Sequence, residues 1–114
     1  MATVKSFTDI LQSRKLAEFL PLESADMWYE DNGLLIPRLG HMPKERTITE
    51  VPCWSLASLL SVLPMIDFTT PQLVGTPKTL YRCMYNDNLK SPACDNAVDA
   101  CYEIIVYLHE QNLL

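Results

Sequence analysis

The strongest constraint on the fold is the apolar pattern near the C-terminal end of the sequence. Six side chains recur at helical spacing and form one stripe: Ala97, Val98, Cys101, Ile104, Ile105 and Leu108. Asn96 and Asp99 have the spacing of a capping box at the start of this segment. A helix of this kind gains most of its stability from what its apolar face contacts. The pattern therefore predicts a helix over residues 97–112 that docks onto a core.

A second helix is predicted over residues 52–63, ending before Pro64. Its only polar side chains are Ser55, Ser58 and Ser61, at a spacing of three. A helix that is apolar around most of its circumference is contacted on several sides. We therefore expect this helix at the centre of the core.

The N-terminal helix has an apolar pattern that changes phase. Ser6 and Asp9 predict its start, because a hydroxyl followed three residues later by a carboxylate is typical of a capping box. The apolar residues form two sets about half a turn apart, Phe7, Ile10 and Leu11 in one and Leu16, Phe19 and Leu20 in the other. Either the helix is kinked near residues 13–14 or it lies between two surfaces. We favour two short helical pieces that end at Pro21.

Residues 25–39 have the pattern of a β-hairpin around Asn32-Gly33, a preferred two-residue turn. This turn would place Trp28 opposite Pro37. Because proline cannot donate to a ladder, the second strand should be an edge. Further strands are predicted over residues 79–85, where strand-forming residues alternate, and over residues 47–51. Residues 65–78 have little periodicity and are expected to be a loop that holds one short extended piece.

These elements predict an α+β fold: a small antiparallel sheet with two to three helices packed on one face. The strand over residues 79–85 is expected to belong to the same sheet as the hairpin. The length of 114 residues fits a single domain, residues 1–114. The predicted core comprises Phe19, Leu20, Trp54, Leu56, Leu59, Leu60, Leu63, Val98, Cys101, Ile104, Ile105 and Leu108.

Charge and composition argue against several classes of partner. The net charge is −5, with nine basic and fourteen acidic residues, which opposes binding to nucleic-acid phosphates or to anionic membranes. No apolar run approaches the ~20 residues that a membrane span needs. No leader-like segment begins the sequence, so we expect a cytoplasmic protein. Its four cysteines contain no Cys-x-x-Cys pair and are expected to be buried free thiols.

The candidate catalytic residues lack partners at the spacing of a known site. His41 lies in a predicted loop, and His109 lies in the last helical turn, where an imidazolium favours the helix dipole. Cys53 would stand at a helix start, which lowers a thiol pKa, but no histidine partner can be identified. Ser55 lacks the Gly-x-Ser-x-Gly pattern of a nucleophile elbow. The sequence therefore predicts no catalytic residue, cofactor or metal.

The segment around the predicted hairpin is acidic and aromatic. Its carboxylates do not have calcium-loop spacing and are expected to be a solvated face: Glu23, Asp26, Glu30 and Asp31. Trp28 and Tyr29 should point to opposite sides of their strand, so one packs inward and the other can stay exposed. We predict an interaction surface made of Trp28, Tyr29, Glu30 and Asp31. Pairing of strand edges or of apolar faces would give a homodimer.

Three blocks of the sequence form distinctive motifs. They are Ser-Ala-Asp-Met at residues 24–27, Pro-Cys-Trp-Ser-Leu-Ala-Ser-Leu-Leu-Ser-Val-Leu-Pro at 52–64, and Asn-Ala-Val-Asp-Ala-Cys at 96–101, continuing to residue 114. Together they resemble short uncharacterised proteins of unknown function from gut bacteria and their phages or mobile elements. The resemblance covers most of the chain. It implies a small intracellular accessory protein and carries no catalytic residue.

We therefore expect a non-enzymatic accessory protein that acts through protein contacts, as a homodimer or with another protein. The alternative is a small-molecule-binding protein or an enzyme with a pocket between sheet and helices, lined by Trp28 or Trp54. A third possibility, an acidic decoy for a nucleic-acid-binding protein, would need regularly spaced carboxylates. The scattered charges give it little support.

Overall fold

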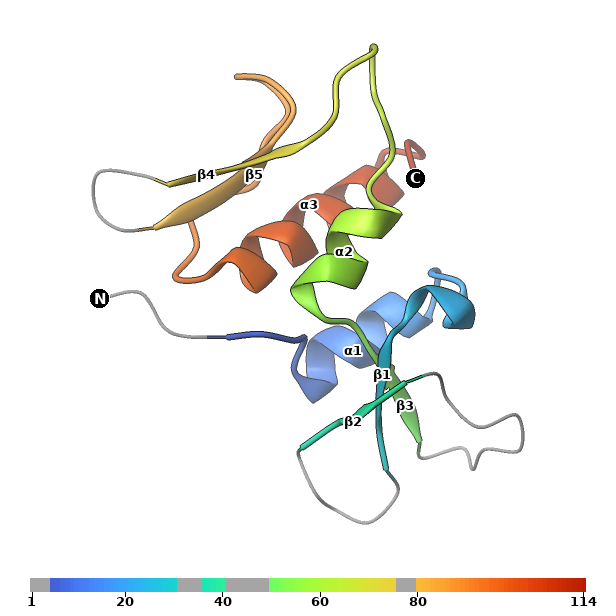
Figure 1. Cartoon of the computed structure of the whole chain (residues 1–114). Helices are drawn as coiled ribbons and strands as arrows, with labels where there is room; N and C mark the ends of the chain where they lie inside the picture. The colour runs from blue at the N-terminus through green and yellow to red at the C-terminus, as the bar shows by residue number, and fades with distance from the viewer. Residues whose placement is uncertain (1–4, 31–35, 41–49, 76–79) are drawn as a thin grey trace.

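Helices separate two small antiparallel sheets (Figure 1). The computed structural model describes residues 5–30, 36–40, 50–75 and 80–114. In these ranges the helices are α1 (Ile10–Ala17), α2 (Leu56–Val62) and α3 (Ala97–Glu110), with a short 3-10 turn, η1 (Leu22–Ser24). The strands are β1 (Met27–Tyr29), β2 (Arg38–Leu39), β3 (Val51–Cys53), β4 (Gln72–Gly75) and β5 (Tyr81–Met84). The α+β class is confirmed.

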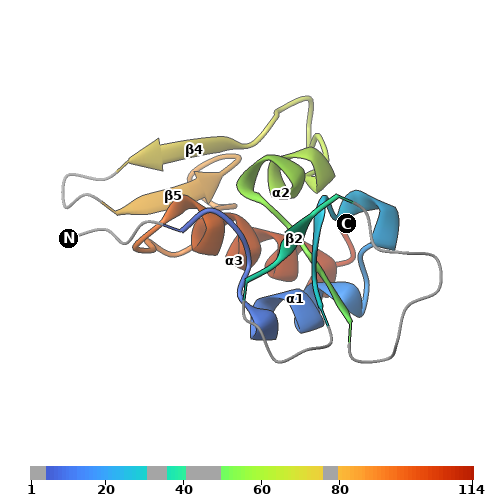
Figure 2. The ribbon, with the colours of Figure 1, turned by 60° about the horizontal axis from the view of Figure 1, so that its bottom comes forward.

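The strands form two sheets, whereas the sequence analysis placed them in one. The order is β2-β1-β3 in the first sheet and β4-β5 in the second, and all neighbours are antiparallel. The two sheets lie at opposite ends of the molecule, with the helices between them (Figures 1 and 2). Because α1 packs on β3 and α3 packs on β5, each sheet buries one face against a different helix.

The predicted hairpin forms, but its register was wrong by one residue. Trp28 pairs with Arg38 rather than with Pro37, and Met27 pairs with Leu39. Since Pro37 has no N–H to donate, the described ladder begins only after it. The prediction that the second strand is an edge is confirmed, because β2 lies at one side of the described sheet. The turn residues Asn32-Gly33 lie outside the described ranges.

The start of the first helix was predicted three residues too early. Asp9 is the N-cap of α1 and forms a complete capping box with Gln12. The preceding residues are extended because their backbone pairs with the segment that leads into α2. The Thr8 N–H donates to the Trp54 carbonyl at 2.9 Å, and the Ser6 carbonyl accepts from the Leu56 N–H at 3.2 Å. These long-range bonds hold Ser6 out of the helix.

The phase change in α1 is explained by two packing surfaces. The helix runs without interruption through residues 13–14, so the favoured division into two pieces was wrong. Leu16 and Leu20 belong to the main core, whereas Phe7 and Ile10 pack against a smaller cluster under the first sheet. The alternative prediction, a helix between two surfaces, is confirmed. Leu11 does not join either cluster and is 73% exposed.

The second helix is shorter than predicted. Pro52 and Cys53 belong to β3, and α2 begins only after Ser55, whose hydroxyl caps it by accepting from the Ser58 N–H. Ser58 is buried and donates its own hydroxyl to the Ser55 carbonyl at 3.0 Å. Leu60, a predicted core residue, is 37% exposed. The helix packs against α3 and η1, but Ala57, Leu60 and Ser61 are exposed, so α2 does not occupy the centre of the core.

The core between the helices and the second sheet contains most of the predicted residues. Its fully buried side chains include Leu16, Trp54, Leu59, Val98, Cys101, Ile104, Ile105 and Leu108. Phe19 and Leu56 pack against this cluster but are only partly buried. The stripe predicted on the C-terminal helix thus lies against the core, and the helix ends slightly earlier than expected, at Glu110.

The N-terminal ends of α1 and α3 are joined by a polar network. Asn96 caps α3 by accepting from the Asp99 N–H at 2.8 Å, as predicted. The Asp99 carboxylate accepts from Lys5 Nζ at 2.7 Å and from Gln12 Nε2 at 2.8 Å. Burial alone would raise the pKa of Asp99, but these hydrogen bonds and the Lys5 charge outweigh it and lower the pKa. The network fixes how the two helices meet.

Candidate interaction site

Only some of the residues predicted to form an interaction surface on the first hairpin are accessible to solvent. Tyr29 is buried, and its hydroxyl donates to the Thr8 carbonyl at 2.7 Å. Trp28, on the opposite side of the strand, is half-buried, and the Glu30 carboxylate forms an ion pair with Arg38. Asp31 lies outside the described ranges. Trp28 and Glu30 are therefore the described members that solvent can reach.

The carboxylates near this hairpin do not converge on one point. Asp26 accepts from the Ser55 backbone N–H at 3.0 Å and also from the Ser55 hydroxyl, so it fixes the start of α2. Burial would raise the pKa of Asp26, but its hydrogen bonds from Ser55 and Ser58 lower it. Glu23 is exposed on η1. In the described part of the chain, no group of three or more His, Cys, Asp or Glu side chains gathers as metal ligands would.

The cysteines are free thiols, and three of the four are buried: Cys53, Cys83 and Cys101. Cys53 is not at a helix start, and burial raises its pKa. Its sulfur lies 3.4 Å from the Thr8 carbonyl in a closed polar cluster under the first sheet. A hydrogen bond with Cys83 and burial both raise the pKa of Cys101. Raised pKa values oppose thiolate formation, so Cys53 and Cys101 act as small core side chains. The hydrogen bond with Cys101 lowers the pKa of Cys83, but the Cys83 side chain is fully buried in the core. Cys94 is half-exposed.

Of the two histidines, the structure describes only His109. His41 lies outside the described ranges. His109 occupies the last turn of α3, as predicted, and its ring stacks on Phe19 with the centroids 3.8 Å apart and the planes 6° from parallel. This ring pair forms one wall of a cavity where the chain leaves α1 and where α2 and α3 end.

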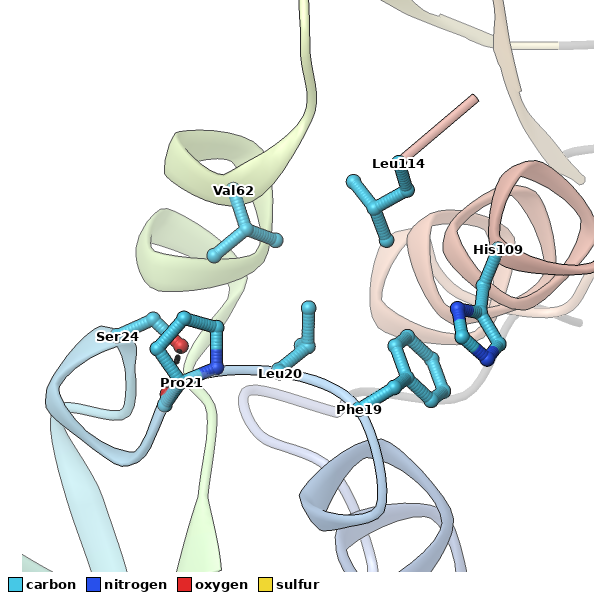
Figure 3. A pocket seen from close by; sticks show the side chains of 7 residues that line it. All are labelled: Phe19, Leu20, Pro21, Ser24, Val62, His109 and Leu114. Atoms are coloured by element: carbon cyan, nitrogen blue, oxygen red, sulfur yellow. Dashed lines mark hydrogen bonds between the residues drawn. The ribbon is translucent and has the colours of Figure 1, made fainter. Parts of the chain in front are cut away.

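We call this space the helix-end cavity. Its volume is about 400 Å³, and it is open to solvent. Its lining is Phe19, Leu20, Pro21, Ser24, Val62, His109 and Leu114, and Figure 3 shows these side chains arranged around it. Only Ser24 and His109 bring polar side-chain atoms, and the Ser24 hydroxyl already accepts from Trp54 Nε1 at 3.0 Å. The cavity thus offers mainly apolar and aromatic contact.

A second unusual feature is the turn over residues 66–69, which we call the Phe68 turn. Ile66 and Thr69 exchange both of their backbone hydrogen bonds, at 3.0 and 2.8 Å. The two residues between them have positive φ, 50° for Asp67 and 63° for Phe68. This is the geometry of a type I′ turn, in which Gly, Asn and Asp are preferred, so Asp67 suits its position. Phe68 is nevertheless an aromatic residue, and it is 97% exposed.

The Phe68 turn and the helix-end cavity are connected through α2. The segment that carries the turn follows α2 directly and rises away from the rest of the molecule in both views (Figures 1 and 2). Other exposed apolar side chains stand close in sequence to the cavity lining: Leu22, Met65 and Leu113. Exposed apolar side chains of this kind are typical of sites for protein contact when they gather in one patch.

Sequence reasoning missed both features. Residues 65–78 were predicted to be a loop with one short extended piece, and β4 confirms that piece. Asp67 suits the first position of a type I′ turn, but Phe68 stands where glycine is preferred, and so the sequence did not predict the turn. The cavity is made from three separate parts of the chain, residues 19–24, residue 62 and residues 109–114, none of which has a distinctive spacing. The only hint was the position of His109 at a helix end.

The pocket expected between sheet and helices does not coincide with this cavity, whose lining includes neither Trp28 nor Trp54. Among the described residues, no helix is long and apolar enough to cross a bilayer. Comparison of the chain with protein-family models, with curated proteins and with solved structures finds no match.

Proposed function

We propose that this chain is a small, non-enzymatic accessory protein that acts through protein contacts made by the Phe68 turn. The observation that carries this proposal is a fully exposed aromatic side chain on a backbone that disfavours it. Outside glycine, a left-handed residue costs about 1–2 kcal/mol, and a bulky side chain is rare there. Phe68 recovers none of this cost through packing, because it is 97% exposed.

A strained residue is informative when nothing within the folded chain compensates for it. The Phe68 turn is short and closed by two backbone hydrogen bonds, so its geometry is well defined. Aromatic residues are over-represented among the side chains that dominate binding energy at protein interfaces. A rigid turn that presents one aromatic ring is therefore suited to insertion into a pocket of a protein partner.

The remaining expectations about function fit this proposal. The free thiols and acidic composition support a cytoplasmic setting, and the negative charge disfavours nucleic acid as the partner. The resemblance to short proteins of gut bacteria and their phages or mobile elements supports an accessory role. The hairpin residues Trp28 and Glu30 remain a secondary contact surface.

The second candidate function is binding of a small apolar or aromatic molecule in the helix-end cavity. Its volume of about 400 Å³ lies within the usual range for ligand sites. However, such sites normally combine apolar walls with several converging polar groups, and here Ser24 is already engaged by Trp54. We therefore rank this function second.

Position-specific crosslinking tests the proposal. Photoreactive p-benzoylphenylalanine is placed at position 68 and, in a matched control, at position 39, where Leu39 is 84% exposed on β2. After irradiation in cells of the native host, we expect a discrete crosslinked protein only with the probe at position 68. Equal crosslinking at both positions, or none at position 68, would contradict the proposal.

A further inference from the structure

We propose that the helix-end cavity of a second copy of this chain receives Phe68, so that two copies form a reciprocal, two-fold dimer. This inference rests on the proposed function and names the partner. Each copy would supply one aromatic anchor and one receiving cavity. The two contacts would then be identical, as they are across any two-fold interface.

The size and chemistry of the cavity match the proposed occupant. A dry cavity of about 150 Å³ is sufficient to bind benzene, and the helix-end cavity measures about 400 Å³. The stacked rings of Phe19 and His109 form one wall, against which a third aromatic ring can pack edge to face or in an offset stack. Leu20, Val62 and Leu114 supply aliphatic contact.

The polar groups beside the anchor and in the cavity lining can also form a hydrogen bond. Asp67 precedes Phe68 and is exposed, and residues 64–75 contain no basic side chain. The lining includes the His109 imidazole, and no side chain in the lining carries a carboxylate. Insertion of Phe68 would bring the Asp67 carboxylate towards the imidazole of the other copy, which can donate a hydrogen bond to it. An anchor flanked by a basic residue would lack this contact.

The anchor does not fill the cavity of its own chain. Phe68 is 97% exposed, and the cavity lining includes no residue of the Phe68 turn. The exposed apolar side chains near the cavity would become buried around the inserted ring: Leu22, Met65 and Leu113. A ring of such contacts excludes water from an interface anchor and strengthens it.

Mixing two defective variants tests the reciprocal arrangement by sedimentation equilibrium. Phe68→Ala removes the anchor but leaves the cavity, whereas Val62→Trp fills the cavity but leaves the anchor. Each variant alone should lose both contacts of the dimer. At about 30-fold per contact, the ratio for a hot spot of about 2 kcal/mol, dimerisation should weaken by roughly 10³-fold. An equimolar mixture should recover a heterodimer, because one intact anchor then meets one intact cavity.

Two controls separate loss of the dimer contacts from non-specific effects of substitution. Leu39→Ala removes a side chain of similar exposure from β2, and its dimerisation should equal that of the parent. If Val62→Trp lowers the melting temperature of the monomer, Leu114→Trp at the exposed end of the lining replaces it.

A parent chain that remains monomeric at millimolar concentration, or a mixture that recovers no heterodimer, would overturn the second copy as partner. If crosslinking from position 68 to another protein persisted in that case, the proposed function would stand. If that crosslinking were lost as well, both the dimer and the proposed function would be refuted.

Discussion

Replacing Phe68 with glycine should make the folded protein more stable, although almost every other removal of a large apolar side chain would weaken it. The left-handed conformation of Phe68 costs about 1–2 kcal/mol, which glycine does not incur. Glycine also increases the entropy of the unfolded chain, which lowers the free energy of unfolding by about 0.5–1 kcal/mol. No burial is lost, because the side chain is 97% exposed. Taken at the midpoints of these ranges, the net gain in the free energy of unfolding is about 0.75 kcal/mol.

Thermal unfolding followed by circular dichroism measures this gain. For a domain of this size, 1 kcal/mol corresponds to about 4 °C, so the melting temperature of Phe68→Gly should rise by roughly 2–4 °C. The measurement is made at low protein concentration, because dimerisation would add to the apparent stability of the parent.

The matched control is Phe68→Ala, which also removes the ring but keeps a Cβ at positive φ. Its melting temperature should stay close to that of the parent, and both variants should lose protein contact equally. Equal melting temperatures for all three chains would refute the argument that strain is retained for binding. A lower melting temperature for Phe68→Gly would show that the ring supports the fold.

The other predictions concern the scaffold. Ile105→Ala should lower the free energy of unfolding by about 2–5 kcal/mol, since Ile105 is fully buried on α3; an unchanged chemical-denaturation midpoint would contradict its placement. Ser55→Ala should lower it by about 1–2 kcal/mol in the same assay, through loss of the hydroxyl that caps α2 and donates to the Asp26 carboxylate. Asp26 and Asp99 have lowered pKa values in the folded chain, so the unfolded chain binds more protons and stability should fall as the pH drops through 3.8 and below. Asp99→Asn should flatten this dependence in acid titrations followed by fluorescence. A maleimide should label only Cys94 in the native protein at pH 8, with mass spectrometry as the readout; labelling of the three buried thiols at the same rate would contradict their burial.

Elements that are determined by their own local sequence were predicted correctly, whereas elements that depend on long-range contacts were not. The α3 helix was predicted well because its stripe and its Asn96 cap are local signals that survive in the fold. The β5 strand was also predicted from its local alternation, whereas β4 was expected only as an extended piece without fixed bounds within residues 65–78.

The errors concern helix boundaries that are set by residues distant in the sequence. The α2 boundary depends on Asp26, which binds Ser55 from 29 positions away, and on the pairing of Cys53 with β1. The start of α1 depends on backbone bonds from Ser6 and Thr8 to the same region. No periodicity within either helix carries this information.

The candidate site was the least predictable part. The cavity exists only because the ends of three helical segments meet, and the Phe68 turn has a sequence that opposes its conformation. Local preference fails here because Phe68 occupies a position that suits glycine.

Fluorine NMR tests the central claim most directly, because the chain contains only three phenylalanines. Phe68 is the proposed anchor, Phe19 lines the cavity, and Phe7 packs in the separate cluster under the first sheet and serves as an internal control. With 4-fluorophenylalanine at all three positions, raising the protein concentration should shift the resonances of Phe68 and Phe19 together and leave that of Phe7 in place. Three resonances that do not change with concentration, or a shift of Phe68 without Phe19, would contradict the account.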